Sequence, residues 1–299
     1  MPRYKLVIEY DGAPYVGWQF QTCGRSVQGE IEAAVSRFCG QTVRIQGAGR
    51  TDAGVHAAGQ VAHLDLARTW RTDTVRDALN AHLKPRPIAI LGVTLVPDTF
   101  NARTSAIRRR YRYTILNRRA PPAMDQARVW HVPYRLSLDN LQAGAALLVG
   151  RHDFTTFRAS ECQAASPVRT LDRFSVEQEG DRIIVVAAAR SFLHTQVRSM
   201  VGTIVGAGAG RRTVEDVGRA LEARNRTACG PLAPPDGLVL TGVDYPASAE
   251  GRPEAEVDCE IQQEAESRDR DGHGCADAEG DAGGEDLSVE GHGREAERE

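Results

Sequence analysis

This 299-residue sequence has neither a long hydrophobic run nor an N-terminal signal-peptide core. Its longest apolar run, Ile183 to Ala189, has the length of a strand, whereas a helix that spans a bilayer needs about 20 apolar residues. The first ten residues, MPRYKLVIEY, contain no signal-peptide core. We therefore expect no membrane partner and a location in the cytoplasm.

Paired metal-ligand residues are also missing. The six cysteines form no CxxC pair and have no regular spacing. Of the eight histidines, His56, His63, His152 and His194 are the candidates for metal ligands, and none pairs with Cys, Asp or another His at the spacing of a metal site. We expect free thiols in a reducing compartment and no metal.

The net charge is only -3, but the charge is unevenly distributed. From Glu250 to Glu299 there are 18 acidic and 5 basic residues, which leaves 22 acidic and 32 basic residues, a net charge of +10, before Glu250. A basic body fits a polyanionic partner such as nucleic acid, although a well-solvated surface would have the same composition. The acidic tail has few large apolar residues, and we expect it to be disordered from about residue 247.

Apolar periodicity predicts strands and helices in both halves of the chain. The expected strands are YKLVIEY, TVRIQGAG, GQVAHLDL, IAILGVTLV, RYRYTIL, a hairpin within DRFSVEQEGDRIIVVAAA, and LVLTGVDY. The expected helices run from Ser26 to Gly40, Thr72 to Leu83, Leu138 to Gly150, and along an apolar stripe from Leu193 to Val205. This mixture favours an α+β architecture over a doubly wound parallel sheet.

The segment GAGRTDAGVHAAGQ, residues 47–60, surrounds a single acid, Asp52, with four glycines and four alanines. Asp and Gly are common turn residues, so a plain turn between two strands is one interpretation. However, Arg50 precedes the acid by two positions, and the small neighbours leave the carboxylate accessible. The pattern GxGRTDxGVHxxxQ therefore makes Asp52 a candidate for a chemically active group.

Seven segments together resemble one known family. They are EYDGAPYVGWQFQ, SVQGEIEAA, GAGRTDAGVHAAGQVAHLD, FNARTSAIRRRYRY, GRHDFTTFR, SFLHTQVRSMVG and APPDGLVLTGVDY. In this order they resemble the tRNA pseudouridine synthases of the TruA type, from about Tyr4 to Tyr245.

The resemblance implies an α+β fold in which two RRM/ferredoxin-like halves share a continuous, mostly antiparallel mixed sheet flanked by helices. It implies an N-terminal half at residues 1–105 with the aspartate loop and a C-terminal half at residues 106–246; the acidic tail at residues 247–299 lies outside it. It also implies a homodimer that isomerises uridine to pseudouridine at positions 38, 39 and 40 in the anticodon stem-loop of tRNA, without a cofactor.

The resemblance also implies residue roles. Asp52 is the implied catalytic carboxylate, Tyr111 stacks on the target uracil, Arg198 is the basic partner of the aspartate, and Arg50 helps to displace the target nucleotide. The chain departs from many relatives at Thr195, where they have a second histidine.

The chemistry of the residues is compatible with these roles. The reaction breaks the N1–C1′ bond and joins C5 to C1′, so one ionised carboxylate can start it by attacking C1′ or C6 or by removing a proton from C2′. From the pattern alone, Tyr111 or Tyr113 could equally be a core residue, and Arg198 a surface residue with a buried stem. A non-catalytic tRNA-binding or folding module remains the alternative function.

The stretch RRRYRY, residues 108–113, adds four arginines around two tyrosines. Such a stretch suits phosphate contact and base stacking on RNA. A solvated edge strand would have the same pattern.

Overall fold

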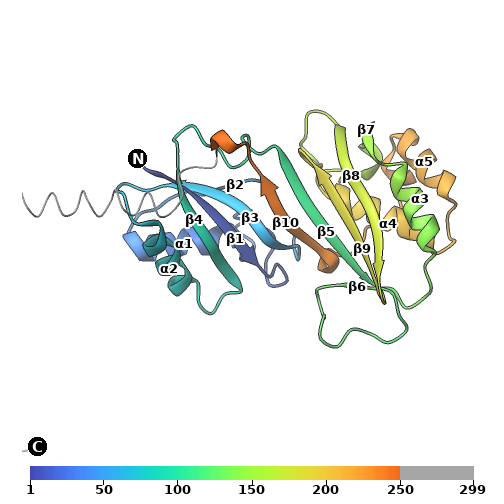
Figure 1. Ribbon diagram of the computed structural model, residues 1–299, viewed down its shortest axis with the longest axis horizontal. Helices are drawn as coiled ribbons and strands as arrows, with labels where there is room; N and C mark the ends of the chain where they lie inside the picture. The colour runs from blue at the N-terminus through green and yellow to red at the C-terminus, as the bar shows by residue number, and fades with distance from the viewer. Residues whose placement is uncertain (250–299) are drawn as a thin grey trace, which may run out of the picture. The chain divides into compact units, whose positions relative to one another are not determined.

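The central feature is one ten-stranded sheet, seen in a computed structural model that describes residues 1–249 (Figure 1). Its main strands follow the order β4-β1-β3-β10-β5-β9-β8-β7, while short strands β2 and β6 pair with β3 and β5. The strands are β1 (Arg3–Tyr10), β2 (Gln46–Gly47), β3 (His56–Asp65), β4 (Ile88–Val96), β5 (Arg108–Leu116), β6 (Trp130–His131), β7 (Gly150–Asp153), β8 (Val168–Glu179), β9 (Arg182–Ala189) and β10 (Leu238–Asp244).

Most neighbouring strands are antiparallel, and the parallel pairs are β10 with β3 and β5 with β6. The last strand, β10, lies between β3 and β5 and so joins segments from the beginning and the middle of the chain into one sheet. The predicted α+β fold with a continuous, mostly antiparallel sheet is confirmed. The division at residues 105 and 106 stays a prediction.

Five α-helices accompany the sheet in this part of the chain: α1 (Val27–Cys39), α2 (Thr72–Leu83), α3 (Leu138–Ala146), α4 (Gln196–Gly208) and α5 (Val214–Ala223). Figure 1 shows α1 and α2 beside β1 and β4, and α3, α4 and α5 beside β8 and β9. None of these helices is long and apolar enough to cross a membrane.

The helices pack on one face of the sheet, which the strand registers identify. Residues directly opposite each other on paired strands point to the same face. One such row crosses the sheet through Tyr10, Ala57, Leu240, Tyr111, Ala187 and Phe174, and all of its members belong to the main hydrophobic core with the helices. The centre of this face, over β3, β10 and β5, lies between the two groups of helices.

Most expected elements are present, and the differences have local causes. The Ser26 hydroxyl caps α1 by accepting from the Gly29 N–H, and Gly40 ends the helix with a φ of 71°. Of the expected strand TVRIQGAG, only Gln46–Gly47 forms a strand, β2, which pairs with β3. Before β2, side chains of α1 bind the backbone at Ile45: Glu32 accepts from its N–H and Gln28 donates to its carbonyl.

Two predicted helices have other bounds than expected, and one helix was not predicted. The helix expected from Leu138 to Gly150 ends at Ala146, and Gly150, with a φ of 112°, begins β7. The helix expected to include Leu193 begins only at Gln196, because Thr195 has a left-handed φ of 60°. Helix α5 was not predicted, although its sequence has a capping box of Thr213 with Asp216 and apolar residues at Val214, Val217 and Leu221. The predicted disorder of the acidic tail concerns residues that are almost all outside the described part of the chain.

Candidate active site

The loop that carries Asp52 connects β2 to β3 and needs glycine because its neighbours come very close. A Cβ on Gly47 would lie 2.6 Å from the Trp18 ring, and Gly54 has a φ of 78° with Pro235 at 2.9 Å from its Cβ position. The Trp18 N–H donates to the Thr51 carbonyl at 3.1 Å. The small residues thus let the loop pack tightly on both sides, while Asp52 stays partly accessible.

Beneath the loop, Tyr10 connects it to the sheet. The Tyr10 hydroxyl lies 2.8 Å from the Thr51 hydroxyl, and burial raises the pKa of Tyr10 to about 12. The residue directly before Asp52 is therefore fixed to β1, which restricts where the carboxylate can lie.

Arg198 on α4 binds Asp52. Its guanidinium NH1 donates to Asp52 Oδ2 at 3.0 Å, and the two side chains are only 12% and 18% exposed. The Arg198 Nε donates to the Ala233 carbonyl at 2.9 Å, and the Ala233 N–H donates back to the Arg198 carbonyl. The guanidinium is thus held in a fixed direction and offsets the cost of removing the carboxylate from water.

His194 also contacts Asp52, and this contact was not predicted from the sequence. Its Nε2 lies 3.3 Å from Asp52 Oδ1, and its Nδ1 lies 3.8 Å from a carboxylate oxygen of the exposed Glu161. His194 precedes Arg198 by four residues, and this spacing is the only signal in the sequence that could have suggested a shared partner. Asp52 therefore lies between two basic side chains.

The side chain of Tyr111 lies on the face of the sheet against which the helices pack. Its ring packs edge-on against Phe192, with ring centres 5.2 Å apart. Burial raises the pKa of Tyr111, and the charges of Tyr10 and Asp52 raise it further. Tyr113 is fully buried and donates to the Pro234 carbonyl at 2.8 Å, and Tyr111, at 9% exposed, belongs to the same core.

Arg50 is the predicted site residue that the structure does not bring to the carboxylate. It is exposed, and its side chain forms no hydrogen bond or ion pair with any residue in the range 1–249. The structure thus joins Asp52 to Arg198 and places Tyr111 where the charge of Asp52 acts on it. Arg50 lies at the surface, two residues from Asp52 in the chain.

The arginines of RRRYRY lie on both faces of the sheet, because β5 is a central strand and its side chains alternate. Arg109 shares the face of Tyr111 and is buried, whereas Arg108, Arg110 and Arg112 are exposed. Arg108 and Arg110 pair with Asp172 and Asp244. The three exposed arginines therefore point away from Asp52.

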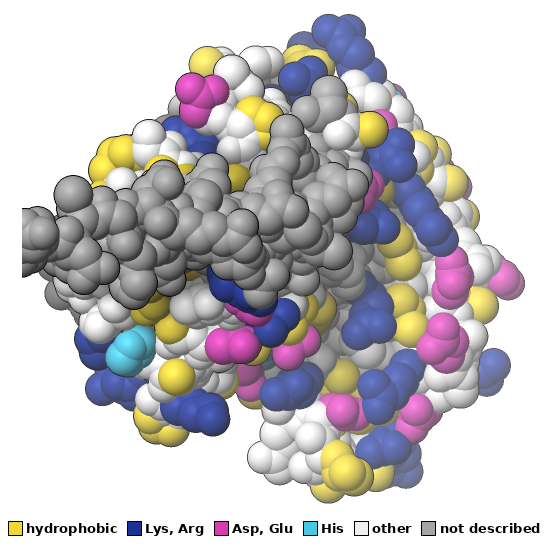
Figure 2. Space-filling model, turned by 60° about the vertical axis from the view of Figure 1, so that its left-hand side comes forward, with side chains coloured by type: hydrophobic (Ala, Val, Ile, Leu, Met, Phe, Trp, Pro, Cys, Tyr) yellow, Lys and Arg dark blue, Asp and Glu magenta, His cyan; other side chains and the backbone are white. Residues whose placement is uncertain are grey.

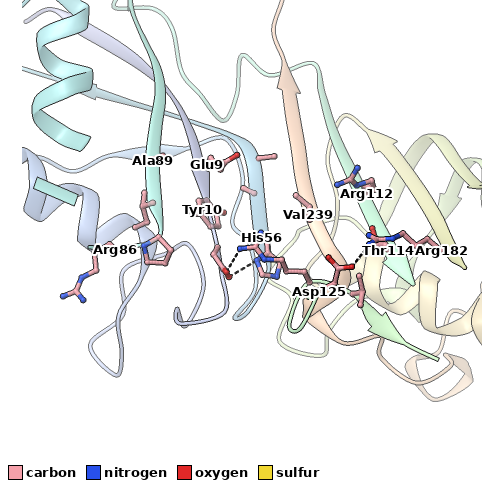
Figure 3. A pocket seen from close by; sticks show the side chains of 17 residues that line it. Glu9, Tyr10, His56, Arg86, Ala89, Arg112, Thr114, Asp125, Arg182 and Val239 are labelled. Carbon is pink, nitrogen blue, oxygen red and sulfur yellow. Dashed lines mark hydrogen bonds and ion pairs between the residues drawn. The ribbon is translucent and has the colours of Figure 1, made fainter. Parts of the chain in front are cut away.

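A cavity of about 560 Å³ lies near one end of β1, β3 and β10, and Asp52 is not among its lining residues (Figure 3). Much of its charged lining is paired within itself. Asp11 contacts His56 and Arg128, each at 3.1 Å, and Asp125 binds Arg182. None of the predicted site residues lines this cavity, and its paired charges do not indicate a particular ligand.

In the described residues, no group of three or more His, Cys, Asp or Glu side chains is placed to hold a metal ion. The expectation that the protein needs neither metal nor cofactor stays a prediction.

Comparison with known proteins gives a consistent result. A family model described as tRNA pseudouridine synthase matches residues 6–103 and 145–246. A protein of Methylobacterium nodulans named tRNA pseudouridine synthase A is 58% identical over 253 residues, covering 85% of this chain and 100% of that protein. Proteins of the same name from Rhodopseudomonas palustris strain BisB5 and Methylobacterium radiotolerans are 59% and 61% identical, each covering 82% of this chain and 100% and 98% of their own lengths.

The family match covers well over half of the chain, and the relatives are matched over nearly their whole length. The chain therefore belongs to the tRNA pseudouridine synthase family and is an enzyme of the isomerase class.

Proposed function

We propose that this enzyme converts uridine to pseudouridine at positions 38, 39 and 40 in the anticodon stem-loop of tRNA, with Asp52 as nucleophile or base and without a cofactor. The observation that carries the proposal is the position of Asp52: partly accessible, bound to Arg198 at 3.0 Å and within 3.3 Å of His194. The tRNA substrate follows from the family and from the relatives' names.

The proposed chemistry needs only groups that the chain itself supplies. The N1–C1′ bond breaks, the C5–C1′ bond forms, and the proton lost from C5 is matched by one gained at N1, so no oxidant or reductant is involved. An ionised carboxylate can form a covalent intermediate or act as a base at C2′. Arg198 donates a charge-assisted hydrogen bond to this carboxylate and fixes its direction, and the His194 ring lies 3.3 Å from its other oxygen.

The target base must leave the RNA stack to reach a carboxylate, which costs a few kcal/mol. We propose that Tyr111 provides the surface against which the uracil stacks, since its ring lies on the same face of the sheet, near the charge of Asp52. We propose that the exposed Arg50 helps to hold the nucleotide out of the stack, since its side chain has no partner in the range 1–249 that it would have to leave.

Asp52→Asn tests the proposal. The substitution removes the charge but hardly changes the shape, so we expect no detectable pseudouridine, with tRNA affinity within about threefold of wild type. The readout is pseudouridine formed in a purified tRNA under single-turnover conditions, with melting temperature and tRNA binding measured in parallel.

Asp77→Asn, on the exposed surface of α2, is the matched control and should behave as wild type. An Asp52→Asn enzyme within about tenfold of the wild-type rate would contradict the catalytic role. If the wild-type chain binds tRNA but forms no product, the non-catalytic tRNA-binding module becomes the better description.

The proposal includes two properties that the family resemblance suggests. We propose that the enzyme is a homodimer and acts in the cytoplasm, and both remain predictions. Sedimentation of the full chain with and without tRNA tests the first, and a monomer under both conditions would contradict it.

A further inference from the structure

Arg109 on β5 is a buried cation for which the proposed chemistry has no use. Its side chain is 8% exposed, and it forms no ion pair with a carboxylate of residues 1–249. Burial lowers its pKa. A buried charge is costly unless it is hydrogen-bonded or paired, so the contacts of Arg109 need an explanation.

Four backbone carbonyls accept hydrogen bonds from Arg109 in place of a carboxylate. The Arg109 NH2 group donates to the carbonyls of Ala48 at 2.7 Å and Arg103 at 2.6 Å. Its NH1 group donates to the carbonyls of Arg190 at 2.5 Å and Ala106 at 3.4 Å. One guanidinium thus joins the Asp52 loop, the loop that follows β4, and the chain just after β9.

These hydrogen bonds place two further arginines beside the candidate active site. Arg103 and Arg190 are both exposed, and their positive charges act on Arg109. Phe192, which contacts Tyr111, follows Arg190 by two residues. His194, which contacts Asp52, follows Arg190 by four residues. Arg190 therefore lies at the edge of the site, and Arg109 links the backbone of Arg103 to the backbone of Arg190.

Arg103 and Arg190 have no acidic partner in the range 1–249, unlike several exposed arginines of the sheet. Figure 2 shows Lys and Arg side chains with Asp and Glu side chains interspersed among them. On the sheet, Arg108, Arg110 and Arg173 each pair with a carboxylate. In contrast, the side chains of Arg103 and Arg190 form neither a hydrogen bond nor an ion pair with any residue in the range 1–249.

We propose that Arg103 and Arg190 bind a backbone phosphate of the RNA next to the nucleotide that enters the Asp52 site, and that Arg109 is the positioning residue that holds them there. A guanidinium matches phosphate oxygens through paired N–H donors. Two cations without acidic partners need not break an ion pair to bind an anion. The proposal rests on the proposed function, because it takes RNA as the ligand.

Salt-dependent binding tests the phosphate site. The affinity of the full chain for an anticodon stem-loop RNA is measured between about 50 and 300 mM salt for wild type, Arg103→Gln, Arg190→Gln and the double variant. Loss of one phosphate contact makes the negative slope of log K against log salt shallower by about 0.7 and weakens binding about fivefold at 0.1 M salt. We expect this loss in the double variant and a part of it in each single variant.

Arg119→Gln is the matched control, since Arg119 is also exposed and lies beyond the opposite end of β5. It should keep the wild-type slope. A double variant with the slope and affinity of the control would overturn the proposal.

Arg109→Lys tests the positioning role separately, because lysine keeps the charge but cannot reach four carbonyls at once. We expect RNA binding as weak as in the double variant, with intact Arg103 and Arg190. If Arg109→Lys folds and binds RNA like wild type, the positioning role is wrong. If it does not fold, the Arg103 and Arg190 variants still decide the proposal.

The binding assay separates this proposal from the proposed function. A wild-type enzyme that binds RNA but forms no pseudouridine, with binding lost in the double variant, leaves the phosphate site standing and refutes the function. Normal turnover with unchanged binding in the double variant supports the proposed function and refutes the phosphate site.

Discussion

At the residue scale, Asp52 depends on partners that are distant in the sequence. Arg198 is 146 residues away along the chain and donates to it through a guanidinium that the Ala233 carbonyl also holds. The sequence suggested Asp52 through its unusual neighbours, and the family resemblance suggested Arg198. Neither indicated that His194 would lie 3.3 Å from the same carboxylate.

Arg198→Met tests the value of that ion pair. It leaves Asp52 and the Ala233 carbonyl without their donor, so we expect a free energy of unfolding lower by about 1–3 kcal/mol. The single-turnover rate at saturating tRNA should fall at least about tenfold. Arg198→Lys, which keeps a charge near Asp52 but cannot bind both partners, should retain more activity. A Met variant as fast as wild type would show that the ion pair does not assist the reaction.

His63 gives a pH-dependent stability. It is buried on β3, and its Nδ1 accepts from the Ala102 N–H at 3.1 Å. Burial, with the nearby charge of Arg3, lowers the pKa of His63 below its ordinary 6.5. The unfolded chain therefore takes up a proton at a higher pH than the folded chain does. The stability conferred by neutral His63 is complete above pH 6.5 and falls as the pH drops below it.

Urea denaturation at pH 7, 6 and 5 measures this effect. We expect the free energy of unfolding to decrease over this range in wild type and to decrease less in His63→Gln, which keeps an acceptor for the Ala102 N–H but does not titrate. Equal pH dependence in the two proteins would contradict the assignment to His63.

At the element scale, α4 determines the geometry of the site. Its second turn packs against the segment before β10, where a Cβ on Gly202 would lie 1.7 Å from the Pro231 carbonyl oxygen. The same segment contains Ala233, which holds Arg198. Close approach at Gly202 therefore brings the guanidinium within reach of Asp52.

Gly202→Ala should separate α4 from this segment. We expect a loss of stability of about 1–3 kcal/mol from overpacking, together with a lower rate of pseudouridine formation. Gly206→Ala, one turn further along α4, is the control, because the nearest atom to its Cβ would be 3.5 Å away. That variant should be as stable as wild type or up to about 1 kcal/mol more stable, since alanine is a better helix former. Thermal unfolding of both variants checks the prediction.

At the scale of the whole molecule, charge is separated along the chain. The residues before Glu250 have a net charge of +10, and those from Glu250 onward have a net charge of -13. Opposite charges on one chain attract each other, and this attraction weakens as salt screens it. Our hypothesis is therefore that the acidic tail competes with RNA for the basic body.

Removal of residues 250–299 tests the competition. We expect the shortened chain to bind tRNA more tightly than the full chain at about 50 mM salt, and the two affinities to converge as salt rises. Equal affinity and equal salt slope would rule out competition by the tail.

Most of the local structure of this protein could be predicted from the sequence alone. Helix caps such as Ser26 and Gly40, the apolar alternation of the strands, and the glycine-rich loop around Asp52 depend on residues that are close together in the chain. Such signals are readable because helical and strand periodicities repeat every few residues.

Which side chains meet depends on the folded arrangement of distant segments. The fold places Arg198 and His194 on Asp52 and puts Arg109 among four carbonyls. These contacts join segments up to 146 residues apart. Their physical cause is the packing of α4, β10 and the Asp52 loop around the centre of one sheet, which no local pattern of residues contains.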